Sequence, residues 1–98
     1  MKIFISQPMR DKTDDEIQKE RQKIVDALRT DYDKDAEILD SFFKDAPHDA
    51  QPLWYLGESL KLLSQADVAY FADGWQACRG CSIEHEAAWR YGIRIIHD

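Results

Sequence analysis

Glu84, near the end of the chain, is the carboxylate best placed for catalysis. It falls in a segment, 80–91, whose periodicity predicts a helix. The buried side of that helix is expected to carry Ile83, Ala87 and Tyr91. Glu84 adjoins this stripe, so its carboxylate should face a crevice and be kept ionised by the helix dipole. Such a carboxylate suits a nucleophile in glycosyl transfer, whereas composition alone favours a solvated glutamate. Glu86, about 200° around the helix, must point elsewhere.

Asp73 is a second candidate, because it directly follows an apolar run at 68–71 that is typical of a buried strand. It could donate a proton at the crevice mouth, or it could simply begin the Asp-Gly turn. Asp67 suits a structural cap, whereas Glu58 and Ser59 could face either the crevice or solvent. Trp75 could stack on a planar ligand or cover the sheet edge.

Cys78 and Cys81 form a C-x-x-C motif between a predicted strand and a predicted helix. This context is typical of thiol redox sites, but only 17 residues follow Cys81, too few for a thioredoxin-like fold. Two cysteines are half of a zinc site, and the three histidines are scattered, so no metal is expected.

The composition predicts one globular domain over residues 1–98, with 44% hydrophobic residues. A net charge of −6 disfavours nucleic acid polymers and anionic membranes, yet it allows a single nucleotide. No apolar run approaches the roughly 20 residues of a membrane span, and the N-terminus is unlike a signal peptide. We therefore expect a cytoplasmic protein with reduced cysteines, and self-association to cover apolar surface.

Four strands and three helices alternate along the sequence. The strands are expected at 2–6, 36–41, 68–71 and 93–97, and the helices from Thr13 to about 31, from Pro52 to 63 and at 80–91. This order predicts an α/β fold, a flavodoxin-like or Rossmann-like parallel sheet in strand order 2-1-3-4. Ligands of such sheets bind at the carboxyl ends of the strands, which places residues 7–10 and 73–79 around one crevice.

Two segments resemble the nucleoside 2-deoxyribosyltransferase-like proteins, and in particular their short phage and bacterial members. The first is the strand Lys2–Ser6 followed by Gln7-Pro8-Met9. The second is Ala66–Phe71, then Gly74-Trp75, then Arg79-Gly80-x3-Glu84-x3-Ala88.

The resemblance implies a retaining reaction without a cofactor, in which Glu84 attacks C1′ of a nucleoside or nucleoside monophosphate. It implies substrate-binding residues at Ser6, Gln7, Pro8, Met9, Gly74, Trp75, Arg79 and Gly80. Family aspartates fall on Ser59 and Cys78 here, so Asp73, Glu58 or a neighbouring subunit would have to supply the acid. The alternatives are a catalytically silent nucleotide-binding module and, with less support, a thiol redox protein.

Overall fold

Four parallel strands form one sheet in the order β2-β1-β3-β4, as the sequence predicted. The computed structural model describes residues 1–41, 43 and 45–98. The strands are β1 (Lys2–Ser6), β2 (Glu37–Leu39), β3 (Val68–Phe71) and β4 (Arg94–His97). β1 and β3 pair from Ile3↔Val68 to Ser6↔Phe71, so their carboxyl ends lie side by side.

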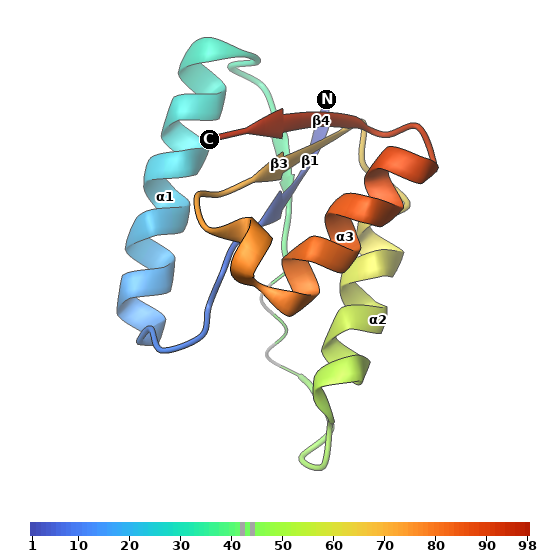
Figure 1. Ribbon diagram of the computed structural model, residues 1–98. Coiled ribbons are helices and arrows are strands. Elements are labelled where there is room, and N and C mark those ends of the chain that lie inside the picture. Colours follow the sequence, from blue (N-terminus) through green and yellow to red (C-terminus); the bar gives the residue numbers. More distant parts are fainter. Residues whose placement is uncertain (42, 44) are drawn as a thin grey trace.

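Three helices cover the two faces of this sheet (Figure 1). They are α1 (Asp14–Asp31), α2 (Pro52–Leu63) and α3 (Arg79–Arg90), and a short 3-10 turn, η1 (Trp75–Ala77), precedes α3. α1 lies on one face, and α2 and α3 lie together on the other (Figure 1). No helix in the described part of the chain is long and apolar enough to cross a membrane.

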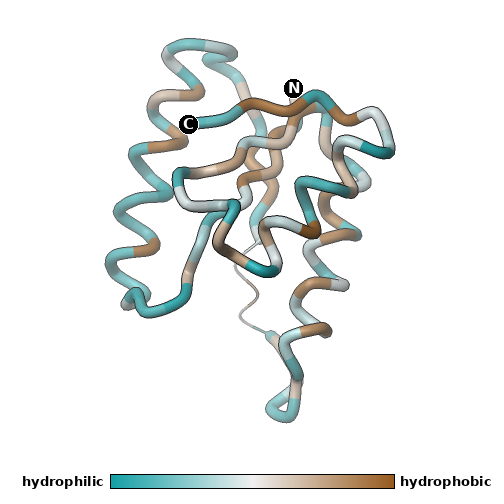
Figure 2. Tube along the Cα trace, in the orientation of Figure 1, coloured by the Kyte–Doolittle hydropathy of each residue, from teal (hydrophilic) through white to brown (hydrophobic). Residues whose placement is uncertain are grey.

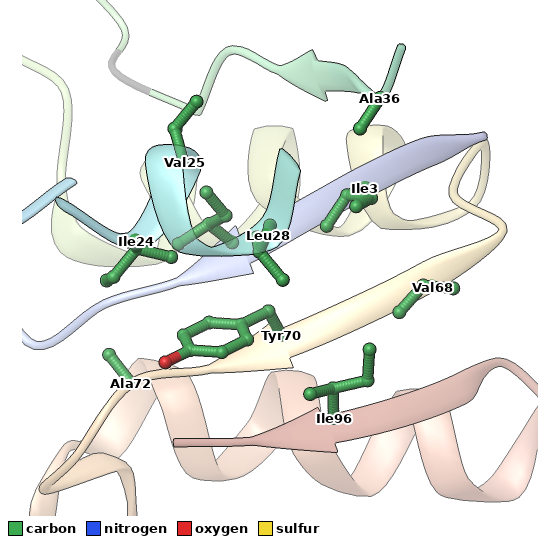
Figure 3. Close-up of a cluster of buried hydrophobic side chains, with 10 residues drawn as sticks. Ile3, Ile24, Val25, Leu28, Ala36, Val68, Tyr70, Ala72 and Ile96 are labelled. Carbon is green, nitrogen blue, oxygen red and sulfur yellow. The ribbon is translucent and has the colours of Figure 1, made fainter. Parts of the chain in front are cut away.

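Side chains alternate along the strands and so build two separate cores. Ile3, Ile5 and Val68 face α1, where they pack with Ile24 and Leu28 (Figure 3). On the opposite face a second cluster packs against α2 and α3: Phe4, Leu39, Leu63, Ala69, Phe71 and Ala88. Along the trace, α1 is mostly hydrophilic with hydrophobic residues spaced through it, as expected for a helix with one buried side (Figure 2).

Local sequence signals fix where the helices begin and end. Thr13 caps α1, accepting a hydrogen bond from the Glu16 N–H at 3.2 Å, while its own N–H donates to the Glu16 carboxylate at 3.3 Å. Pro52 is the first residue of α2. Gly92, just beyond α3, has a φ of +73°, a left-handed conformation that glycine adopts at helix ends without steric cost.

The buried side of α3 is not the predicted one. Ile83 and Tyr91 are exposed, and the side chains that face the sheet are Cys81, Glu84 and Ala88. The buried side was not recognised because Glu84 stands in its middle, and a glutamate is normally expected to face solvent. Ala27 of α1 and Leu53 of α2 are exposed as well. β2 is shorter than the predicted 36–41.

Candidate active site

An open cavity of about 900 Å³ lies at the carboxyl end of β1, against α2 and α3. Its wall includes the loop after β1, the segment after β2, the first half of α2 and the first turns of α3. Parallel topology explains this convergence, because the connections after β1 and β2 leave from the same edge of the sheet.

Glu84 is the buried carboxylate of this cavity, with only 7% of its surface exposed. The Ser6 hydroxyl donates a hydrogen bond to Glu84 Oε1 at 2.7 Å, and Ser59 on α2 is a second hydrogen-bond partner. Burial raises the pKa of Glu84 above its ordinary value, and the hydrogen bonds from the two serines lower it in part. Glu84 is thus held on three sides, by its own helix, β1 and α2.

Burial opposes the ionised form of Glu84 that the sequence led us to expect. Glu84 is the sixth residue of α3, counted from Arg79, and the dipole acts mainly within the first turn. Loss of hydration is the larger effect, so the protein holds a carboxylate whose charged form is destabilised. The hydroxyls of Ser6 and Ser59 favour the charged form of Glu84.

The raised pKa of Glu84 predicts a pH-dependent stability. Between the ordinary glutamate pKa of 4.5 and the higher pKa of Glu84, the folded state binds more protons than the unfolded state, so stability falls as pH rises. Each pKa unit corresponds to about 1.4 kcal/mol. We expect Glu84→Gln to unfold at a higher temperature than the parent at pH 8, with a difference that shrinks below pH 4.5. Thermal melts across pH measure this, and a variant that is less stable at pH 8 would contradict it.

Glu86 points away from the cavity, as the helical spacing predicted. Its carboxylate accepts a hydrogen bond from Arg90 Nε at 2.6 Å on the exposed side of α3. Glu86→Gln is therefore the matched control for substitutions of Glu84, because it removes the same charge from the same helix.

The end of β1 contributes Ser6 to the cavity wall, and the loop after it contributes Gln7 and Met9. Gln7 is buried, and its Nε2 donates to the Ile17 carbonyl at 2.9 Å and to Glu20 at 3.0 Å, which ties the loop to α1. Pro8, a predicted binding residue, is not part of the wall. It lies instead beside Gly74, where an added Cβ would come 3.8 Å from Pro8 Cγ.

Asp73 does not share a cavity with Glu84, which corrects the prediction of a carboxylate pair at one crevice. It lines a separate hollow of about 350 Å³ with Lys12 and Lys23. The chain turns toward α1 after β3, since Ala72 belongs to the core on the α1 face. Asp73 and Glu84 therefore line different hollows.

Trp75 and Gly74 also lie outside the cavity wall. The indole of Trp75 stacks on the His85 ring, with centroids 3.9 Å apart and planes within 8°. His85 in turn lies 2.9 Å from His97, Nε2 to Nε2. Of the two readings for Trp75, covering the sheet edge is the one that these contacts support.

Arg79, Gly80, Cys78 and Cys81 bring the start of α3 into the cavity wall. Arg79 is exposed, as is Arg10 of the loop after β1, so two cations stand where the cavity opens to solvent. Cys81 is buried, and burial raises the pKa of its thiol. In the described part of the chain, no three His, Cys, Asp or Glu side chains come together as a metal site would require.

The segment after β2 and the start of α2 supply a wall of the cavity that was not predicted from the sequence. Ser41, Phe43, Tyr55 and Leu56 line the cavity there. The parallel topology could have predicted this wall, because β2 ends at the same edge of the sheet as β1, where the site forms. Glu58, left open as an acid, instead pairs with Lys61 at 2.9 Å and does not line the cavity.

No protein-family model, curated protein or solved structure matches this chain.

Proposed function

We propose that this protein is a nucleoside or nucleotide N-glycosidase or deoxyribosyltransferase that acts through a covalent ester on Glu84. The observation that carries the proposal is a carboxylate, 7% exposed, on the wall of an open cavity with a serine hydroxyl 2.7 Å from its oxygen. A retaining glycosyl transfer needs such a carboxylate, sheltered from water but held in one orientation.

In the first step an oxygen of the Glu84 carboxylate attacks C1′ of the sugar. The C1′–N bond breaks, its electron pair leaves with the base, and the base takes a proton from water at the cavity mouth. In the second step water attacks C1′, which releases the sugar and the carboxylate, and the proton of that water returns to solvent. A second base in place of this water gives transfer instead of hydrolysis.

The size and lining of the cavity suit a nucleotide. Its volume of about 900 Å³ is within the range of small-molecule sites. Phe43, Tyr55 and Leu56 give an apolar and aromatic side against which a planar base can pack. Arg10 and Arg79 supply positive charge toward a phosphate, in a chain whose net charge is −6.

The two arginines predict a preference for monophosphates. We expect Arg79→Gln to raise KM for a deoxynucleoside 5′-monophosphate about tenfold, the scale of one partly exposed charged hydrogen bond. Its KM for the free deoxynucleoside should stay the same. Arg94→Gln, on β4 and outside the cavity wall, is the control. Equal effects of Arg79→Gln on both substrates would exclude this role.

The alternative is a module that binds a nucleotide without turning it over. It is favoured by one observation: among the described residues of the cavity wall, Glu84 is the single carboxylate, so no carboxylic acid faces it to protonate the base. The experiment that decides is incubation with a panel of deoxynucleosides and their monophosphates, with free base read by chromatography and binding read by thermal shift. Base release supports the enzyme, and a thermal shift without base release supports the module.

A further inference from the structure

Two free thiols, Cys78 and Cys81, share the cavity wall with Glu84. Cys78 is the N-cap of α3, and its Sγ accepts a hydrogen bond from the Cys81 N–H at 3.4 Å. The Cys81 thiol is also in hydrogen-bonding contact with the thiol of Cys78. The two sulfurs thus already face each other across the first turn of the helix.

The backbone at this turn allows a bond between them. Residues three apart within a regular helix have Cβ atoms about 5–6 Å apart, farther than the roughly 3.5–4.5 Å of a disulfide. Cys78, however, precedes the helix with an extended backbone, φ −98° and ψ 119°, and its side chain folds back over the first turn. A change in side-chain torsions can therefore close the bond while the rest of α3 stays in place.

The two cysteines differ in their access to reagents. Cys78 is half-buried on an open cavity, so a small disulfide can reach its sulfur. Cys81 is 3% exposed, and burial raises the pKa of its thiol, so an external reagent reaches and reacts with it less readily than with Cys78. The more accessible Cys78 is therefore suited to attack an external disulfide, and the buried Cys81 is suited to resolve the product.

We propose that Cys78 and Cys81 are a reversible redox pair in which Cys78 attacks a small disulfide and Cys81 resolves the product. The Cys78 thiolate attacks one sulfur of a disulfide such as oxidised glutathione, the S–S bond breaks, and one thiolate leaves and takes up a proton. Cys81 then gives its proton to solvent, and its sulfur attacks Cys78 to form the Cys78–Cys81 bond and release the second thiol. The net reaction converts one protein dithiol and one disulfide into one protein disulfide and two thiols.

Ser6 connects the two cysteines to Glu84, the proposed nucleophile. The Ser6 hydroxyl donates to Glu84 at 2.7 Å and is also a hydrogen-bond partner of the Cys81 thiol. Forming the disulfide removes that thiol from the contact. We expect base release to fall in the oxidised protein and to return on reduction, an effect that rests on the proposed function, whereas disulfide formation itself does not.

The test is equilibration of the full chain in glutathione buffers, then trapping of free thiols with an alkylating reagent and mass measurement. In excess oxidised glutathione the parent should resist alkylation and lack two hydrogens, and reduction should restore both thiols. Cys81→Ser should accumulate a mixed disulfide with glutathione on Cys78. Cys78→Ser should react about tenfold or more slowly, because only a buried thiol remains.

Three results would overturn the redox pair. They are a parent that keeps both thiols free, a Cys81→Ser variant that forms no mixed disulfide, and a Cys78→Ser variant that reacts as fast as the parent. A disulfide that forms without changing base release would overturn only the link through Ser6. If no base release exists at all, alkylation still tests the disulfide.

Discussion

Replacing Glu84 with glutamine is expected to lower the rate of base release about a thousandfold or more, the scale of an essential nucleophile. Glutamine keeps the shape of the side chain and an oxygen to accept the Ser6 hydrogen bond, but it lacks the charge that attacks C1′. Ligand binding should survive, because the other walls of the cavity supply most contacts with base and phosphate. Steady-state kinetics with the most active substrate of the panel, and thermal shift for binding, measure the two effects separately.

Glu86→Gln is the control for this substitution and should retain nearly full activity. Glu86 lies on the same helix but pairs with Arg90 on its exposed side. If Glu86→Gln abolished base release and Glu84→Gln did not, both the mechanism and the assignment of the nucleophile would be wrong.

Replacing Ser6 with alanine is expected to lower kcat/KM about 10–100-fold, the cost of losing one hydrogen bond to a buried charge. It should also move the acid limb of the pH profile to higher pH. The reason is that Ser6 is one of two hydroxyls that lower the pKa of Glu84 against the larger effect of burial. Without it the carboxylate takes up its proton at a higher pH and loses its nucleophilic form.

A merely structural role for Ser6 would leave the acid limb in place. Ser64→Ala, at the exposed end of α2, provides the matched control and should change neither rate nor pH profile. If Ser6→Ala were slower and melted at a lower temperature but kept the acid limb of the parent, the role of Ser6 in the ionisation of Glu84 would be contradicted.

The elements of the fold could be predicted because their signals are local. The apolar run of β1, the Thr13 cap and the position of Pro52 each act within a few residues, and the structure confirms all three. The parallel order followed from the alternation of strands and helices, which leaves few topologies open. The buried side of α3 could not be predicted, because Glu84 interrupts its apolar pattern.

The site could be predicted only in part, for a related reason. Glu84 lies in the cavity wall as expected, although the apolar stripe on which that expectation rested is not the buried side of α3. Asp73 lines a different hollow, beside Lys12 and Lys23, and the turn that follows β3 gave no local signal of this. The wall formed by Phe43 and Tyr55 depends on the packing of distant segments, which no local pattern encodes.

Capture of the sugar on the protein would show whether Glu84 is the nucleophile. A substrate analogue with fluorine at C2′ destabilises the cationic transition state of both steps, and paired with a good leaving base it lets the ester outlive its formation. The protein incubated with such an analogue is then digested, and the peptides are measured by mass spectrometry. We expect one fluorosugar bound through an ester to Glu84, and none in Glu84→Gln. Base release from the natural substrate with no adduct on Glu84, or with the adduct on another residue, would contradict it.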